Sequence, residues 1–94
     1  MERGVTRERL ILSGKYDALV ERMAERNHET WMRQRQAEGW RLGPERCDRL
    51  KETPCMVPWA DLPEPEREHD RELARASLAL LGELGYRLVP PEET

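Results

Sequence analysis

Three residues in the first half of the chain have side chains suited to holding a flat ligand with a negative charge. Asn27 and Trp31 are four residues apart, so they share one face if the segment around them is helical. A tryptophan ring stacks on an aromatic base with roughly 1–3 kcal/mol, and an arginine such as Arg46 forms paired hydrogen bonds with anions. A core position for Trp31 is the alternative, and spacing alone favours that alternative.

Two Glu-x-x-His pairs raise the question of a metal site. Glu25 and His28 form the first pair, and Glu66 and His69 form the second. This spacing puts a carboxylate and an imidazole on one helix face, as in carboxylate-bridged di-metal bundles. Such a bundle needs two further helices, and Glu25 lies off the apolar face of its segment. We therefore expect surface or capping roles for these pairs, with no bound metal and no cofactor.

Catalytic chemistry has little support in the sequence. Ser77 falls on an apolar stripe, and neither Cys47 nor Cys55 has a histidine close to it in the sequence. The two cysteines form no C-x-x-C pair and no histidine lies at zinc spacing from them, so we expect free thiols. No glycine-rich loop of the phosphate-binding kind is present. The sequence therefore predicts a protein that is not an enzyme.

The composition limits the chain to one small domain. It has 94 residues, of which 37% are hydrophobic and 37% charged. The net charge of −3 and the pI of about 5.5 argue against nucleic acid as a partner. Residues 1–51 carry 12 Lys and Arg against 9 Asp and Glu, whereas residues 52–94 carry 4 against 10. We see no signal peptide and no membrane-spanning run, and therefore expect a soluble, cytoplasmic protein with no membrane partner.

A first helix is predicted over residues 15–38, because apolar residues recur there at three- and four-residue spacing. Gly39 is expected to end it, since glycine tolerates the left-handed conformation of a C-terminal cap. Residues 1–14 form a lead-in that is either partly disordered or a short strand, and the domain itself is expected over residues 15–94. The residues that recur at this spacing are Tyr16, Val20, Met23, Asn27 and Trp31, with Leu19 and Ala24 beside them.

A second helix is predicted to begin near Asp61 or Glu64 and to end at Gly85. Asp61 is the expected N-cap, and the acidic residues after it favour the positive end of the helix dipole. Between the helices, residues 40–61 form a long connection in which residues 55–57 suit a short edge strand, and residues 86–89 suit another. The core stripe expected on the second helix consists of Leu73, Ser77, Leu80, Leu81 and Leu84.

Six short motifs resemble the ryanodine-receptor repeat, or RyR domain, over residues 18–89. In order along the chain they are NHETW (27–31), EGW (38–40), GPERCD (43–48), PCMVPW (54–59), LPE (62–64) and LLGELGY (80–86). That module occurs in tandem copies in the large calcium-release channels and as single copies in bacterial and phage proteins. The chain looks like one of these single-copy bacterial or phage members.

The resemblance implies an α+β, mostly helical fold. Its two main antiparallel helices would be joined by a long extended connection with a few short strands. In the channels, repeats pair about a pseudo-two-fold axis, and one pair looks like an adenine-nucleotide site with the base between two family tryptophans. Trp31 matches that tryptophan and Arg46 an arginine near the ligand, whereas Trp40 and Trp59 match positions that we take as core.

The resemblance favours Trp31 as a ligand-stacking residue, and the first hypothesis follows from it. The chain would be a non-enzymatic small-ligand-binding or sensor module for an adenine-nucleotide-type ligand, with Trp31, Arg46 and Asn27 as the ligand-binding residues. A single repeat lacks its tandem partner, so we expect a homodimer that recreates the two-fold pair. The alternative is a protein–protein interaction or scaffolding module without a small ligand, in which the oppositely charged halves serve partner docking.

Overall fold

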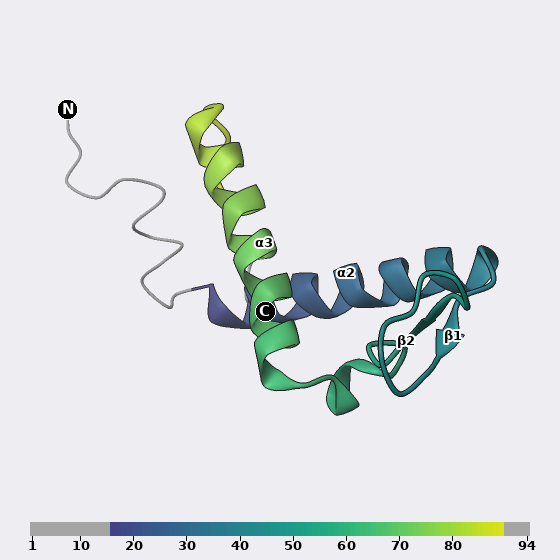
Figure 1. The fold of residues 1–94 in the computed structure, drawn as a ribbon. Helices are drawn as coiled ribbons and strands as arrows, with labels where there is room; N and C mark the ends of the chain where they lie inside the picture. Colours follow the sequence, from purple (N-terminus) through teal and green to yellow (C-terminus); the bar gives the residue numbers. More distant parts are fainter. Residues whose placement is uncertain (1–15, 90–94) are drawn as a thin grey trace, which may run out of the picture.

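Two long helices dominate residues 16–89, the part of the chain that the structure describes. In this computed structural model α2 spans Asp17–Ala37 and α3 spans Glu64–Glu83 (Figure 1). This content confirms the mostly helical α+β class. The lead-in predicted for residues 1–14 lies outside the described residues. Between the helices come β1 (Arg41–Leu42), β2 (Glu52–Thr53) and a 3₁₀ turn, η1 (Trp59–Asp61).

Both helices end at glycines, as the sequence predicts. Gly39 follows the C-cap of α2 with φ of 95°, and Gly85 follows the C-cap of α3 with φ of 96°. These are left-handed conformations that residues with a Cβ rarely adopt. The end of α2 also receives a side chain from the connection, because Lys51 Nζ donates a hydrogen bond of 2.7 Å to the carbonyl oxygen of Glu38.

Helix α3 begins at Glu64, one of the two predicted starts, but its N-cap differs from the prediction. Asp61, the expected N-cap, is the last residue of η1, and Pro63 occupies the N-cap position without a side-chain hydrogen bond. Glu64 and Glu66 lie in the first turn, where negative charge is stabilised by the positive end of the helix dipole. Proline geometry and acidic charge therefore define the start of this helix in place of a capping hydroxyl or carboxylate.

The two helices cross steeply in Figure 1, so the antiparallel arrangement expected for them is not confirmed. Val20 of α2 packs with Ala74 and Leu78 of α3 in the core, and Tyr16 and Leu88 are among the residues that pack against this cluster. Ala74 has 0% of its surface exposed, and its small side chain lets the helices approach closely. The contact lies in the first half of α2, and steeply crossing helices share only a short length, which limits how much of α3 the core can cover.

The core stripe predicted for α3 is wrong. Leu73, Leu80 and Leu84 are 50%, 52% and 64% exposed, and Ser77 and Leu81 are exposed as well. By helical periodicity, the stripe lies roughly a third of a turn away from the face that meets α2. Because the helices meet only where they cross, the larger leucines stay at the surface. The buried side of α3 consists of Ala74, Leu78 and Gly82.

The buried side of α2 agrees with the predicted face at Val20 and Ala24 but differs from it further along the helix. Asn27 is exposed and Trp31 is only half-buried, whereas His28 is buried. The residues that enter the interior are spaced four apart: Val20, Ala24 and His28. Trp40 and Trp59, which the sequence analysis assigned to the core, are both half-buried. The interior therefore contains one histidine beside apolar side chains such as Met56 and Leu62, and none of the three tryptophans is fully buried.

The strands lie elsewhere than predicted. β1 and β2 pair in parallel, with Arg41 opposite Glu52 and Leu42 opposite Thr53. Gly43 follows this pair so closely that a Cβ there would lie 2.6 Å from the Cβ of Glu52. Residues 55–57 and 86–89, both expected as strands, are irregular. Prolines on both sides of residues 55–57 lack backbone N–H groups, so this segment is a poor partner in a strand ladder.

A network of ion pairs joins α2, η1 and α3. Arg71 Nε donates to Glu21 Oε1 at 2.8 Å, and Arg71 Nη1 also contacts Glu64 and Glu68. Trp59 Nε1 donates to the second oxygen of Glu21 at 3.1 Å, and the Arg71 guanidinium lies 5.8 Å from the Trp59 ring centroid. The hydrogen bonds from Arg71 hold the pKa values of Glu21 and Glu64 below their ordinary range.

Replacing Arg71 with methionine should reduce the loss of folding stability as the pH falls into the acid range. A carboxylate with a lowered pKa in the folded state contributes stability above its unfolded pKa and loses it as pH falls through the folded pKa. The free energy of unfolding of Arg71→Met should therefore fall less steeply below the ordinary glutamate value of 4.5. Urea denaturation followed by circular dichroism from about pH 3 to about pH 7 measures this slope.

The matched control is Arg22→Met, because the Arg22 side chain is 73% exposed and pairs only with its neighbour Glu25 in the described part of the chain. In Arg22→Met, the free energy of unfolding should fall with decreasing pH as steeply as in the unchanged protein. Equal acid slopes for Arg71→Met and the unchanged protein would contradict the role given to the Arg71 network.

Candidate functional site

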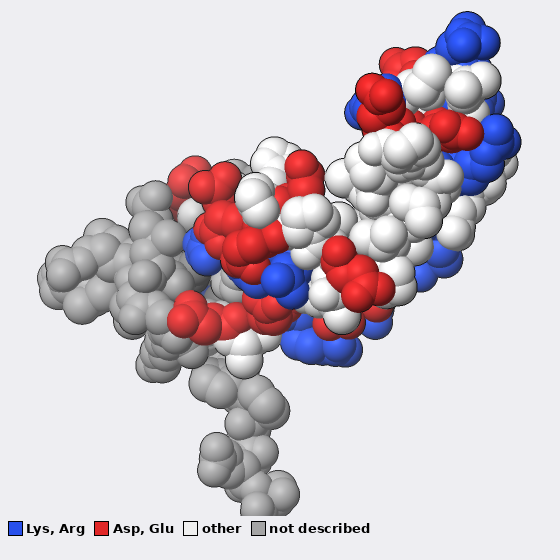
Figure 2. Space-filling view, turned by 60° about the horizontal axis from the view of Figure 1, so that its bottom comes forward, with Lys and Arg blue, Asp and Glu red and all other residues white. Residues whose placement is uncertain are grey.

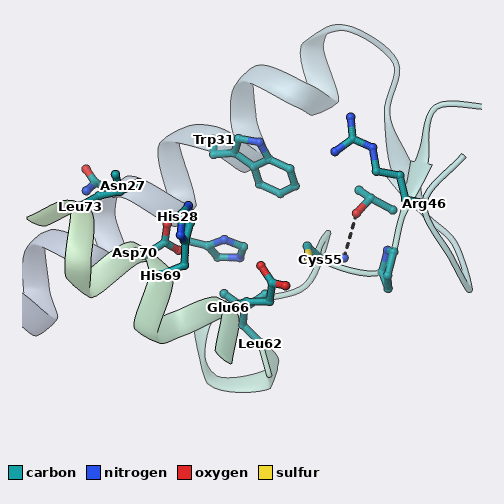
Figure 3. A pocket seen from close by; sticks show the side chains of 12 residues that line it. Asn27, His28, Trp31, Arg46, Cys55, Leu62, Glu66, His69, Asp70 and Leu73 are labelled. Atoms are coloured by element: carbon teal, nitrogen blue, oxygen red, sulfur yellow. Dashed lines mark hydrogen bonds between the residues drawn. The ribbon is translucent and has the colours of Figure 1, made fainter. Parts of the chain in front are cut away.

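A pocket of about 630 Å³ lies between α2, the connection and the first half of α3 (Figure 3). Its lining includes all three residues that the sequence analysis names as ligand-binding: Asn27, Trp31 and Arg46. Asn27 and Arg46 lie at opposite ends of the pocket, and the Trp31 ring lies between them. The fold thus brings these residues, from a helix and a loop, around a single cavity.

The charged end of the pocket at Arg46 is close to solvent. The Arg46 side chain is 70% exposed, and its Nε lies 2.9 Å from Asp48 Oδ1. Its guanidinium carbon is 5.4 Å from the centroid of the Trp40 ring. Arg46 is therefore oriented by an acid and an aromatic ring from its own loop, and Asp48 offsets part of its charge.

His28 positions the Trp31 ring. Its side chain is buried, with 4% of the residue exposed, and its Nε2 lies 2.7 Å from the carbonyl oxygen of Val57. A carbonyl only accepts, so Nε2 carries the proton and donates. The imidazole stacks on Trp31 with 5.7 Å between ring centroids and 21° between planes, and it tilts against Trp59 at 6.1 Å. The sequence analysis considered His28 only as part of a metal pair and missed this role.

The Glu-x-x-His pairs are used in other ways. Glu25 pairs with Arg22 at 3.3 Å, and His28 donates to Val57, so these two side chains do not converge on one point. Glu66 and His69 both line the pocket from α3. Within residues 16–89, no group of three or more His, Cys, Asp or Glu side chains is arranged to hold a metal ion.

Two carboxylates of α3 line the pocket opposite α2. Glu66 and Asp70 are one helical turn apart, and burial raises the pKa of Asp70. Figure 3 shows the Glu66 carboxylate on the side of the pocket that faces Trp31, next to Cys55. The sequence analysis did not name Glu66 or Asp70 as ligand-binding residues. Their four-residue spacing in the sequence could have suggested a shared face, although not which face.

Cys55 lies between the opposite charges of the pocket. Burial raises the pKa of its thiol, the negative charges of Glu66 and Asp70 raise it further, and Arg46 lowers it. Its backbone N–H donates to Thr53 Oγ1 at 3.2 Å. A thiol with a raised pKa stays protonated at neutral pH and is a poor nucleophile. Cys55 therefore contributes a small, largely apolar wall.

One face of the molecule carries both signs of charge. On the face shown in Figure 2, acidic and basic side chains are interspersed with uncharged ones, and no single sign covers it. None of the helices in residues 16–89 combines the length and the apolar character needed to cross a bilayer.

A protein-family model described as the RyR domain matches residues 3–90. The chain belongs to the RyR domain family. The match covers nearly the whole chain, including every residue that lines the pocket. It confirms the resemblance drawn from the six sequence motifs. Membership defines the fold family of this RyR domain, whereas its function has to be argued from the pocket.

Replacing His28 with leucine should destabilise this RyR domain by roughly 1–3 kcal/mol, because the partly buried Val57 carbonyl would lose its donor. Urea denaturation measures the free energy of unfolding. His69→Leu is the matched control, since His69 is exposed and its replacement should change stability by about 0.5 kcal/mol or less. Similar losses in the two variants would show that the hydrogen bond does not stabilise the connection.

Proposed function

We propose that this RyR domain is a non-enzymatic binding or sensor module for an adenine-nucleotide-type ligand. One observation carries the proposal: Trp31, Arg46 and Asn27 line a single pocket. The adenine base stacks on the Trp31 ring, which His28 supports from within the fold. Arg46 meets a phosphate at one end of the pocket, and the Asn27 amide supplies hydrogen bonds at the other.

The chemistry of the lining supports binding over catalysis. The Cys55 thiol is protonated at neutral pH because its pKa is raised, so it is a weak nucleophile. His28, which is buried beside Trp31, uses its Nε2 proton to hold the Val57 carbonyl. The Cys55 thiol is thus a poor nucleophile and His28 holds the connection in place, and we assign the pocket to ligand recognition.

The proposal includes a homodimer. In a two-fold arrangement the same surface of each chain meets its copy, so the base would lie between two Trp31 rings. Trp31 is half-buried in the described part of the chain, which leaves ring surface for a second contact. A small domain also gains apolar burial by pairing, because its own core is limited.

Replacing Trp31 with alanine should weaken nucleotide binding by the loss of one stacking contact, roughly 1–3 kcal/mol, or about 5- to 150-fold in Kd. Isothermal titration calorimetry with AMP, ADP, ATP, cyclic AMP and ADP-ribose measures this. Tyr86→Ala is the matched control, because Tyr86 is 64% exposed and does not line the pocket. Unchanged affinity in Trp31→Ala, or no heat from any of these nucleotides, would rule out the stacking site.

The homodimer should appear as a species of twice the 11.1 kDa chain mass in sedimentation velocity. Its fraction should rise with protein concentration and with saturating nucleotide, because a ligand bound between two rings stabilises the pair by mass action. Trp31→Ala should lose the nucleotide effect. A monomer at every concentration in the presence of bound nucleotide would overturn the dimer and leave the base on one ring only.

The second candidate function is protein–protein interaction or scaffolding without a small ligand. It is favoured by the exposed apolar side chains on and just after α3, because large apolar residues at the surface are typical of contact sites. The nucleotide titration separates the two functions, since a scaffold gives no heat with any member of the panel. The residues concerned are Leu73, Leu80, Leu84 and Tyr86.

A further inference from the structure

The pocket carries opposite charges on two of its walls. Arg46 comes from the connection, whereas Glu66 and Asp70 come from α3 (Figure 3). All three act on the Cys55 thiol, the acids in one direction and the arginine in the other, so Cys55 lies within the field of both walls. A ligand that fills this space would therefore place an acceptor or negative charge near Arg46 and donor groups near Glu66 and Asp70.

The two pocket acids differ from their neighbours on the same helix. Glu64 is paired with Arg67 and Arg71, and Glu68 is paired with Arg71 and Arg75. The hydrogen bonds and ion pairs within residues 16–89 leave the Glu66 and Asp70 carboxylates without a protein donor. Asp70 is also partly buried, which raises its pKa. Both side chains line the pocket, where the exposed Glu66 and the half-buried Asp70 present acceptor oxygens that donor groups of a ligand can reach.

We propose that Glu66 and Asp70 form a sugar subsite for the vicinal 2′- and 3′-hydroxyls of an adenine ribonucleotide. The inference rests on the proposed function, because it places the base on Trp31. Two hydroxyl groups are donors that carboxylate oxygens accept in short, charge-assisted hydrogen bonds. The Glu66 carboxylate lies on the side of the pocket that faces the Trp31 ring, where the sugar of a stacked base would be found.

The same acids fix the direction of the ligand. A phosphate beside Glu66 and Asp70 would place like charges together, whereas a phosphate beside Arg46 meets the opposite charge. The 5′-phosphate therefore points to Arg46 while the hydroxyls point to α3. The site accordingly takes 5′-nucleotides with both ribose hydroxyls free, and it discriminates against ligands in which either hydroxyl is missing or esterified.

Calorimetry with three probes tests the subsite: AMP, 2′,3′-dideoxy-AMP and 3′,5′-cyclic AMP. The unchanged protein should bind AMP on the order of tenfold more tightly than either of the other two, because only AMP keeps both donors and a free 5′-phosphate. In the double variant Glu66→Gln/Asp70→Asn, the affinity for AMP should fall to about twice that for 2′,3′-dideoxy-AMP or less. The affinity for 2′,3′-dideoxy-AMP itself should stay unchanged, because this ligand lacks the two hydroxyl donors.

The matched control is Glu72→Gln/Glu83→Gln, which removes two exposed acids of α3 that do not line the pocket. It should keep the tenfold preference. Thermal unfolding by circular dichroism checks that both double variants stay folded under the conditions of the titration.

Each other outcome is decisive. Equal binding of AMP and 2′,3′-dideoxy-AMP by the unchanged protein, with Trp31→Ala still weakening both, overturns the sugar subsite and leaves the stacking site standing. A folded Glu66→Gln/Asp70→Asn variant that weakens both probes alike, or that keeps the full preference, also overturns it. No binding of any adenine nucleotide to the unchanged protein overturns the sugar subsite and the proposed function together.

Discussion

The buried hydrogen bond between His28 Nε2 and the Val57 carbonyl is the constraint on which the site depends. The connection between α2 and α3 has only two strands of two residues each, so its own backbone pairing cannot hold it in place. His28 links that connection to α2 from inside the fold. Because the same imidazole stacks on Trp31, one side chain sets both the position of the loop and the orientation of the ring. This link joins two walls of the pocket, α2 and the connection.

Local features of the fold could be predicted from the sequence, whereas features set by packing could not. Gly39 and Gly85 mark the helix ends because their positive φ angles are a local backbone requirement. The leucine pattern of α3 also predicts the helix, but it gives the wrong buried face. Periodicity shows which residues share a side and says nothing about where another helix crosses. Ala74 and Leu78, at that crossing, are buried in place of Leu80 and Leu84.

The same distinction between local and packing features applies to the residues of the candidate site. Trp31 and Arg46 could be named from family motifs, and the structure places both around one cavity together with Asn27. Glu66 and Asp70 could not be named, because which helix face meets the connection depends on how α3 crosses α2. His28 was visible in the sequence only as a polar residue beside the expected face. Its burial depends on a carbonyl 29 residues away, and no local pattern encodes that partner.

In the proposed function, the contacts of Arg46 indicate how much its end of the pocket contributes to ligand affinity. Its pair with Asp48 joins two side chains that are 70% and 75% exposed, and such pairs contribute about 1 kcal/mol or less. Exchanging Asp48 for a phosphate is therefore nearly neutral, and a phosphate at the rim adds little affinity by itself. The wall formed by α3 differs, because Asp70 is half-buried and its acceptors have less water to bind in the absence of a ligand. In the proposed mode of binding, affinity and selectivity thus depend mainly on the Trp31 ring and the acids of α3, and Arg46 sets the direction in which the ligand enters.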